Sequence, residues 1–483
     1  MRDVTRLLFS LCLLGSLSCA ASASDAFPPE VPAAPSGPQL DPAQQALADR
    51  LDAAARVALA NPDAPVAGFA LKVVARGAAL LERGYGFSDL DRQRPLPANA
   101  IFRIGSITKP FTAAAILQLA EQGKLQLDQP LSSYLKEPYL KGTGQPMARV
   151  TLRQLLQHSS GIPNFTNLPW FEGHRSEAAA PAEVVAAFAE LPLEFEPGTR
   201  FAYSNSGYFL LGLVLEQVSG QRYIDYLRQH LFAPAGIVDT RYCPDAQDYP
   251  GAVPGYQRGP GKLMPASAIS MTIPFSAGGL CSTVGDLVSW SQALVAGKII
   301  QPERFAAMSS GAILAEGQHS PYGLGLFRGE LEGHARLSHA GGIEGFVSDL
   351  AYYPDADLYI AVLANTEGAL ASSLSEQLAR IALGIPEAEP RDLPVTEAEV
   401  QPLLGTYQIA DLGQTLLVAW RDGALRLGPA QAPDKSFRLR AQGGGVYLVP
   451  ELKASIRFEL EAGKARTLLL HQQGHDARGE RVP

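Results

Sequence analysis

The sequence predicts an α+β domain over residues 41–388, followed by a smaller all-β domain. Strand-like runs occur at both ends of the first region, and the stretch between them, 150–310, consists mostly of predicted helices with long loops. The late strands must therefore share one sheet with the early ones, around a helical insertion. Beyond about residue 386, short strand-like runs alternate with turns, which is typical of an antiparallel barrel or sandwich.

Local signals define the first elements. A helix is expected from Asp41, a favoured N-cap residue that is followed by proline. Two extended apolar runs within residues 66–90 are joined by an Arg-Gly turn, which predicts a hairpin at the edge of a sheet. The helix that begins at Ser106 is nearly all apolar over residues 111–120, so we expect it to be buried on every side.

The late strands are expected at 322–327, 344–354 and 357–366, with a Pro-Asp-Ala-Asp turn between the last two. A closing helix is expected over 369–383. A Pro/Glu-rich linker is then predicted at 389–398.

The remaining residues, 399–483, are predicted to form a small antiparallel barrel of short strands. Its expected strands are Leu416–Trp420, Leu425–Leu427, Phe437–Arg440, Val446–Val449, Ile456–Leu460 and Thr467–Leu470.

The N-terminal residues have the features of a secretory signal. Two arginines precede a short apolar run over residues 7–17, and small residues follow, so we expect residues 1–23 to be a signal peptide cleaved after Ala23. The run is too short for a membrane anchor, which needs about 20 apolar residues. Residues 24–40 are Pro/Ala-rich and predict a flexible tether. We therefore expect a secreted or periplasmic chain with no integral membrane segment after signal removal.

Bulk properties exclude some classes of partner. The net charge of −8 and the lack of any basic run argue against nucleic acid and against an anionic membrane surface. No spacing typical of a metal or cofactor site stands out, so we expect neither. The oligomeric state does not follow from the sequence.

Two cysteines, Cys243 and Cys281, remain in the mature chain. An oxidising compartment permits a disulfide between them, and two buried thiols are an equally good interpretation.

Two S-x-x-K patterns compete as nucleophile and base. Ser106 stands three residues before Lys109 in the buried helix, so their side chains share one face. Ser133 and Lys136 lie in a short segment between prolines that we expect to be exposed. A serine nucleophile needs a base within reach in a dry site that keeps lysine partly neutral, and only Ser106 has that burial. The alternative for Ser106 is a simple helix N-cap.

Two further motifs carry chemistry. In the single Y-x-N, the Tyr203 hydroxyl is suited to take and return a proton beside a cation, and Asn205 is suited to bind a substrate amide. In the single H-x-G, the glycines at 341 and 342 would let a substrate lie against a strand edge. Taken alone, Tyr203 is more typical of a core aromatic and His339 of a structural histidine.

In this order, S-x-x-K, Y-x-N and H-x-G resemble the serine β-lactamase and penicillin-binding-protein superfamily, most closely the class C β-lactamase-like serine hydrolases. The surrounding stretches FRIGSITKPFTAAAILQLAEQGKLQLDQPLSSYL, VTLRQLLQHSSGIPNF, FEPGTRFAYSNSGYFLLGLVLEQVSG and SAGGLCSTVGDLVSW resemble it too, from about residue 60 to 385. The resemblance implies a five-stranded antiparallel sheet flanked by helices, with an inserted helical subdomain. The C-terminal segment resembles the lipocalin-like barrel that many relatives append.

The resemblance also implies roles. The chain would be a serine hydrolase that forms an acyl-enzyme, with an oxyanion hole made by the backbone N–H groups of Ser106 and Gly342. His158 matches a position that we interpret as structural. The implied catalytic residues are Ser106 (nucleophile), Lys109 (activating partner) and Tyr203 (proton shuttle), and the implied substrate- or oxyanion-binding residues are Asn205, His339, Gly341 and Gly342.

One departure bears on the substrate. Relatives with Lys-Thr-Gly in the third motif supply a charge and a hydroxyl for a substrate carboxylate, whereas His339 supplies at most a conditional charge and Ala340 no hydroxyl. This favours an esterase, an amidase or a peptidase such as a D-aminopeptidase, which would act on a small molecule or a peptide. If Glu344 kept His339 protonated, a D,D-carboxypeptidase would be favoured instead.

Three alternatives stay open. The chain could be a true β-lactamase, or a non-catalytic penicillin-binding or sensor protein. The C-terminal barrel could also be the working part, as a binder of a ligand or lipid.

Overall fold

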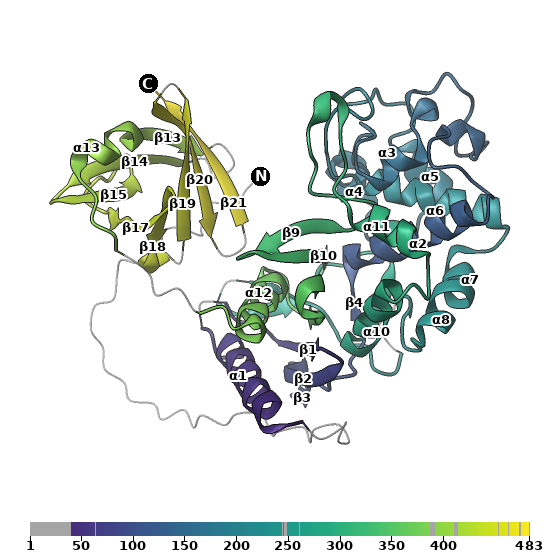
Figure 1. Cartoon of the computed structure of the whole chain (residues 1–483). Coiled ribbons are helices and arrows are strands. Elements are labelled where there is room, and N and C mark those ends of the chain that lie inside the picture. Colours follow the sequence, from purple (N-terminus) through teal and green to yellow (C-terminus); the bar gives the residue numbers. More distant parts are fainter. Residues whose placement is uncertain are drawn as a thin grey trace. The chain divides into compact units, whose positions relative to one another are not determined.

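The computed structural model describes residues 40–482 except 63, 244, 246–248, 260, 387–391, 410–413, 453, 462 and 473–474 (Figure 1). The predicted signal peptide lies outside the described residues, as does the tether except for Leu40. Within the described part of the chain, no helix is long and apolar enough to cross a membrane. The chain divides into two compact units after Ile385, which are considered separately below.

The first unit is built on a seven-stranded antiparallel sheet with the order β3-β2-β1-β12-β11-β10-β9. The predicted hairpin forms β1 and β2, and β1 also pairs with β12 in the register Phe69↔Ala364. The expectation that early and late strands share one sheet is thereby confirmed, and only a two-residue strand separates the hairpin from the edge of that sheet. The strands are β1 (Gly68–Ala75), β2 (Ala78–Asp89), β3 (Arg94–Pro95), β9 (Phe327–Leu331), β10 (His334–Ile343), β11 (Phe346–Tyr353) and β12 (Leu358–Ala364).

The sheet has seven strands rather than five because a short strand is added at each edge. β3 contributes two residues beside β2, and β9 forms a hairpin with β10. The strand expected at 322–327 starts only at Phe327. Gly325 has φ +99°, and a Cβ on Gly323 would lie 2.3 Å from the carbonyl oxygen of Met308, so this stretch runs as an irregular segment against its neighbours.

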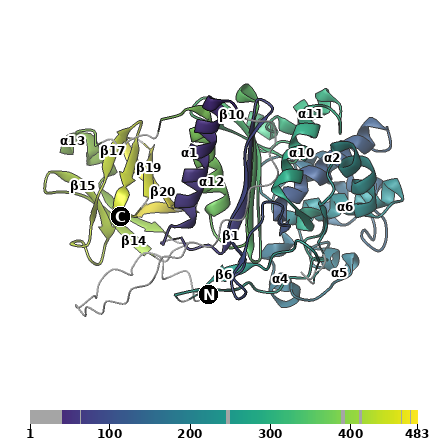
Figure 2. The same ribbon diagram turned by 90° about the horizontal axis from the view of Figure 1, so that it is seen from below.

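The sheet separates two hydrophobic cores. β12 is buried along its whole length, and its residues alternate between the cores, with Ala361 and Leu363 in one and Ile360 and Val362 in the other. Figure 2 shows α1 and α12 on one side of β1 and α2, α6 and α10 on the other. These helices are α1 (Pro42–Leu59), α2 (Thr108–Glu121), α6 (Asn205–Ser219), α10 (Val284–Val295) and α12 (Leu370–Leu383).

Two helix predictions are confirmed. Asp41 caps α1 with a full capping box to Gln44. α2 is buried from Thr108 to Leu117, as its uniformly apolar sequence indicates.

The helical insertion predicted between the strands forms part of the wall of the cavity described below. Its remaining helices are α3 (Leu152–Leu156), α4 (Pro169–His174), α5 (Pro181–Ala186), α7 (Tyr223–Leu227), α8 (Ala233–Ala235), α9 (Phe275–Gly278) and α11 (Pro302–Ser309). One short strand, β4 (Phe102–Arg103), precedes α2, and four others lie between α8 and α10: β5 (Arg241–Tyr242), β6 (Tyr256–Arg258), β7 (Leu263–Pro265) and β8 (Leu280–Ser282).

The second unit is the predicted all-β domain. Nine antiparallel strands follow the order β16-β15-β14-β13-β21-β20-β19-β18-β17, and the two edge strands are adjacent in the chain, so the sheet curls into a nearly closed barrel. Tyr407, Ile456 and Leu468 fill its core. Its elements are α13 (Glu397–Val400), β13 (Gly405–Ile409), β14 (Gln414–Arg421), β15 (Ala424–Pro429), β16 (Phe437–Arg438), β17 (Arg440–Gly443), β18 (Val446–Val449), β19 (Ala454–Glu461), β20 (Lys464–Gln472) and β21 (His475–Val482).

Candidate active site

A small three-stranded sheet, β4-β8-β5, positions two sides of the candidate site. β4 leads into the 3-10 turn Gly105–Ile107, which carries Ser106, and α9, which carries Ala277, leads into β8. The pairs Phe102↔Ser282 and Arg103↔Cys281 join β4 to β8. Ser106 therefore precedes α2 in a separate turn, and the interpretation of Ser106 as the N-cap of α2 does not hold, because Ile107 is the N-cap and makes no side-chain cap bond.

Lys109 lies at the centre of the site and is fully buried. Its Nζ is 3.0 Å from Ser106 Oγ, 2.8 Å from Asn205 Oδ1 and 2.8 Å from the carbonyl oxygen of Ala277. Burial holds the pKa of Lys109 well below its usual range, because the charged form loses its hydration. A neutral amine has two N–H donors, which match the two oxygens that only accept. Its lone pair is then left for the Ser106 hydroxyl, which is the geometry of a general base.

The Y-x-N motif lies on the opposite side of Lys109. The Tyr203 ring centroid is 4.7 Å from Lys109 Nζ, and the Tyr203 hydroxyl is hydrogen-bonded to Ser106. Burial raises the pKa of Tyr203 although that hydrogen bond lowers it, so the phenol keeps its proton at neutral pH. Asn205 is the first residue of α6, and its Nδ2 donates to Thr166 Oγ1 at 3.2 Å.

A cavity of about 540 Å³ opens beside Ser106. This volume is in the range of small-molecule and short-peptide sites. Asn205, Gly342 and Phe171 also line it. The neighbouring Trp170 is not among the lining residues and stacks on His174, with ring centroids 4.8 Å apart.

The two glycines of the third motif have different environments. A Cβ on Gly341 would lie 2.1 Å from the carbonyl oxygen of Ile104, so Gly341 allows β10 to approach the chain just before Ser106. Gly342 faces open space and lines the cavity, where its backbone is accessible to a substrate. Both glycines lie within β10, whereas the sequence predicts the motif just before a strand, because adjacent glycines weaken the strand signal.

His339 does not lie where a substrate contact is expected. It does not line the cavity, and its side chain is buried among Tyr203, Tyr322 and Phe327. Burial is the main cause that lowers the pKa of His339, to about 3, so the ring is neutral at physiological pH. Nδ1 lies 2.6 Å from the Ala340 carbonyl oxygen and must carry the proton, so Nε2 accepts from the Tyr322 hydroxyl at 3.0 Å.

The sequence leaves open that Glu344 keeps His339 protonated, and the structure does not support this. Glu344 is the residue that the sequence suggests as a partner for His339, but it pairs with Arg175 at 2.9 Å. Both Glu344 and Arg175 line the cavity. His339 therefore has no carboxylate partner among the described residues that would keep it protonated.

The competing S-x-x-K pattern lies away from this site. Ser133 is exposed at the end of a 3-10 turn, and Lys136 donates to the carbonyl oxygen of Ser132 at 2.7 Å rather than to Ser133. The structure therefore brings Ser106, Lys109, Tyr203 and Asn205 together and leaves Ser133 out.

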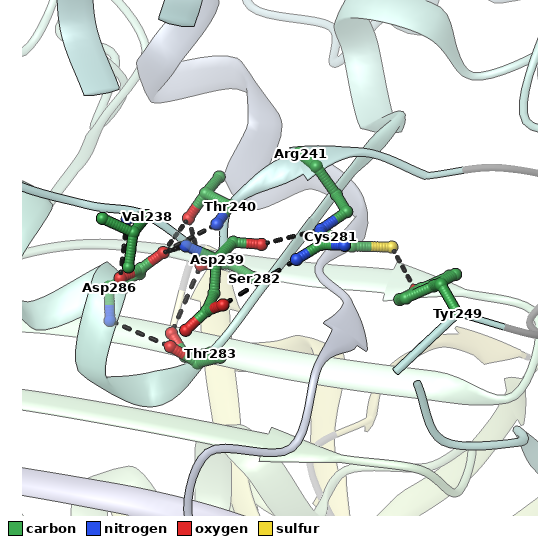
Figure 3. A network of polar contacts seen from close by, with 9 residues as sticks. All are labelled: Val238, Asp239, Thr240, Arg241, Tyr249, Cys281, Ser282, Thr283 and Asp286. Atoms are coloured by element: carbon green, nitrogen blue, oxygen red, sulfur yellow. Dashed lines mark hydrogen bonds and ion pairs between the residues drawn. The ribbon is translucent and has the colours of Figure 1, made fainter. Parts of the chain in front are cut away.

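Behind the site, Asp286 fixes the third strand of the small sheet (Figure 3). Its buried carboxylate accepts from the backbone N–H groups of Asp239 (2.8 Å) and Thr240 (2.7 Å), and from the Thr240 hydroxyl at 2.8 Å. The backbone N–H of Val238 donates to the other carboxylate oxygen at 3.4 Å. Because β5 follows directly and pairs with β8, this carboxylate stabilises the strand next to Ala277.

Asp286→Ala is expected to lower the free energy of unfolding by about 3 kcal/mol, because it leaves the buried N–H of Thr240 and the part-buried N–H of Asp239 unpaired, at about 1–3 kcal/mol for a buried donor. Urea unfolding followed by tryptophan fluorescence measures this, since Trp290 lies on the same helix. The matched control is Asp239→Ala, which removes only an exposed pair with Arg241 and should cost well under about 1 kcal/mol. Equal losses in the two variants would contradict this account.

The same strand pair resolves the cysteine alternatives. Cys243 and Cys281 form a disulfide with a Cα–Cα distance of 5.2 Å, across 38 residues of sequence. Cys281 lies in β8 opposite Arg241 of β5, and Cys243 directly follows β5. The pairing of these strands, which the sequence does not predict, brings the two cysteines together.

Several contributors to the site carry no sequence signal of their own. The Ala277 oxygen belongs to the backbone, and Thr166, Arg175 and Glu367 enter the cavity wall from a 3-10 turn, from the end of α4 and from the segment after β12. The stretch SAGGLCSTVGDLVSW contains both Ala277 and Asp286, so the sequence marks the segment without marking these functions. In the described residues, no group of three or more His, Cys, Asp or Glu side chains is arranged to hold a metal ion.

Comparisons with known proteins agree with this architecture. The family model described as Beta-lactamase matches residues 45–383. Penicillin-binding protein 4* of Bacillus subtilis (strain 168) is 26% identical over 444 residues, which cover 84% of this chain and 93% of that protein. A D-aminopeptidase of Brucella anthropi is 27% identical over 328 residues, which cover 67% of this chain and 60% of that protein. The chain therefore spans about three fifths of that second relative.

Solved structures with similar folds include a D-stereospecific amidohydrolase from Streptomyces sp., which is 25% identical with a TM-score of 0.59 and covers 71% of this chain and 99% of its own. A D-amino acid amidase from Ochrobactrum anthropi SV3 is 25% identical with a TM-score of 0.58, and the match covers 69% of this chain and 98% of the amidase. With a family model that spans most of the first unit and a site built from S-x-x-K, Y-x-N and H-x-G, the chain belongs to the beta-lactamase family of serine hydrolases.

Proposed function

We propose that this chain cleaves an ester or amide bond through an acyl-enzyme on Ser106, and that its acyl donor has no penicillin-like carboxylate. The observation that carries the proposal is the environment of Lys109, whose Nζ lies 3.0 Å from Ser106 Oγ while Asn205 and Ala277 take its two N–H donors. A neutral lysine in this position accepts the serine proton as the oxygen attacks.

In the proposed acylation, Ser106 Oγ bonds to the substrate carbonyl carbon while its proton moves to Lys109 Nζ. The carbonyl oxygen becomes an oxyanion, held by the backbone N–H groups of Ser106 and Gly342. When the intermediate collapses, the bond to the leaving group breaks, and the leaving group receives the proton through the Tyr203 hydroxyl. Water then attacks the acyl-enzyme in the same way, which releases the acid and restores Ser106.

The charges around the cavity support a substrate without a carboxylate. His339 is neutral and turned away, and Ala340 has no hydroxyl. Arg175 is already paired with Glu344 at 2.9 Å and with Glu172 at 3.7 Å.

The remaining ionisable residue of the cavity wall, Glu367, makes no ion pair with any described residue, so an anionic group would meet a net negative wall. A D,D-carboxypeptidase, whose substrate ends in a carboxylate, is therefore less favoured. The similarity to proteins named D-aminopeptidase and D-amino acid amidase supports esters and D-amino acid amides as the class to test first.

The test compares kcat/KM for a p-nitrophenyl ester, a D-amino acid amide and nitrocefin. Each charge-assisted hydrogen bond that the cephalosporin carboxylate lacks is worth about tenfold to a hundredfold, so the ester or amide should be favoured by at least that factor. The L-amide is the matched control for the amide. Nitrocefin winning by a wide margin would restore the alternative of a true β-lactamase. No turnover of any of the three substrates would support the alternative of a non-catalytic penicillin-binding or sensor protein.

The organisation of the chain is part of the proposal. We propose that residues 1–23 are a signal peptide that directs the chain to the periplasm or out of the cell. Residues 24–40 would then form a tether to a hydrolase domain at residues 41–388. A linker at 389–398 then leads to a lipocalin-like domain at 399–483. The disulfide between Cys243 and Cys281 supports an oxidising compartment.

A further inference from the structure

A buried histidine, His158, lies directly behind Tyr203 and takes no part in the steps proposed above. It follows α3 and has φ +55°, a left-handed backbone conformation that histidine, asparagine and aspartate tolerate better than most residues. Its side chain is 1% exposed. A residue held in this conformation, in contact with the proposed proton shuttle, is a candidate for a positioning role.

His158 holds the backbone on both sides of Tyr203. The N–H of Ala202 donates to the His158 carbonyl oxygen at 2.8 Å, and the N–H of Ser204 donates to His158 Nδ1 at 3.1 Å. One residue therefore fixes the positions before and after Tyr203 in the chain.

The imidazole also holds the Tyr203 ring. The two ring centroids are 4.2 Å apart, and Tyr322 and Tyr208 pack on other parts of the imidazole at 4.6 Å and 5.0 Å. Lys109 Nζ is a further neighbour of the Tyr203 ring at 4.7 Å. Contacts with both groups leave the phenol little freedom to swing its hydroxyl away from Ser106.

The hydrogen bonds of His158 exclude a role as a second general base. Nδ1 accepts from a backbone N–H, so the proton of the neutral ring is on Nε2, and no lone pair remains to take a proton from Tyr203 or Lys109. Burial keeps the pKa of His158 well below its usual range, and a charge on Lys109 or on His339 would lower it further. His158 is therefore not a second base.

The surroundings of His158 Nε2 indicate why a histidine and not a phenylalanine occupies this position. It is buried and has no hydrogen-bond partner, which is a cost to stability that a phenylalanine at this position would avoid. What a phenylalanine lacks is the acceptor at Nδ1. The imidazole thus combines an acceptor for Ser204 with a flat ring for Tyr203.

We infer that His158 is a positioning residue that aligns the Tyr203 hydroxyl with Ser106, through its two backbone hydrogen bonds and through the contact between the rings. The inference rests on the proposed function, because it gives Tyr203 a task in proton transfer. It goes beyond that function by assigning the alignment to a residue that touches neither substrate nor nucleophile.

Two substitutions separate the two contributions. His158→Asn keeps an acceptor near the position of Nδ1 and tolerates the left-handed backbone, but it removes the ring. His158→Phe keeps a ring and removes the acceptor, which leaves the buried N–H of Ser204 unpaired. Each variant is made in the full-length chain, alone and together with Tyr203→Phe, which retains the phenyl ring and loses only the hydroxyl.

The measurement is kcat and KM for a p-nitrophenyl ester, with thermal unfolding as a check on folding. Because His158 acts through the Tyr203 hydroxyl, we expect each variant to lower kcat by about tenfold or more in the wild-type background, with KM nearly unchanged. In the Tyr203→Phe background the same substitutions should change kcat by less than about twofold. A variant that merely loosened the fold would lose the same factor in both backgrounds.

The outcomes are distinct. Equal losses with and without the Tyr203 hydroxyl, or a wild-type kcat in both His158 variants, would overturn the inference. If His158→Phe does not fold, His158→Asn decides alone, because it preserves the hydrogen bond and the backbone conformation. Failure of the proposed function looks different, since the wild-type chain itself would then show no ester hydrolysis.

Discussion

Ser106→Ala should abolish both hydrolysis and covalent labelling by a fluorophosphonate, whereas Ser133→Ala should leave both unchanged. The reason is the contrast between the two S-x-x-K patterns. Ser106 Oγ lies 3.0 Å from the buried Nζ of Lys109, whereas Ser133 is exposed and its lysine donates to the backbone oxygen of Ser132. Only the first serine has a base whose pKa burial lowers well below its usual range.

Intact-mass spectrometry after labelling makes the comparison, since each labelled serine adds one probe mass. We expect one adduct on the wild type, one on Ser133→Ala and none on Ser106→Ala. An adduct that persists without Ser106 and disappears without Ser133 would refute the assignment. Thermal unfolding of Ser106→Ala provides the control for folding, because the lost hydroxyl is partly exposed at the cavity and its removal leaves the core intact.

The contacts that could be predicted from the sequence are mostly local. Ser106 and Lys109 are one turn apart, so their shared face follows from helical spacing alone, and the uniformly apolar residues of α2 predict its burial. Tyr203 and Asn205 are also close together because only one residue separates them in the sequence. That Lys109 joins the two motifs is a long-range fact, spanning 96 residues to Asn205, which only the motif order and the family resemblance suggest.

His339 shows where local reasoning ends. The sequence leaves open a protonated ring beside Glu344, whereas the fold buries the ring against Tyr322 and directs Glu344 to Arg175. Both outcomes depend on contacts between distant segments, which no pattern within β10 encodes. The disulfide is a similar case, because the 38 intervening residues do not define a Cα separation and only the pairing of β5 with β8 does.

Lys109→Ala and Tyr203→Phe should each lower kcat by about a thousandfold or more, and the double variant should be little worse than either single one. Both groups meet at the Ser106 hydroxyl, Lys109 through its Nζ and Tyr203 through its own hydroxyl. Proton transfer from Ser106 to the leaving group needs both in sequence, so removing one already breaks the route. Losses that multiply fully in the double variant would show that the two groups act separately.

The pH dependence separates their roles. Burial lowers the pKa of Lys109 and raises that of Tyr203, so near neutral pH the lysine is the group able to accept a proton and the tyrosine is a protonated relay. As the pH falls, Lys109 takes up a proton and loses the lone pair that faces Ser106, so kcat/KM should fall along an acidic limb. That limb should lie far below the pH at which an ordinary lysine titrates. It should persist in Tyr203→Phe at a lower rate and vanish in Lys109→Ala. An acidic limb that survives unchanged without Lys109 would assign the base to another group.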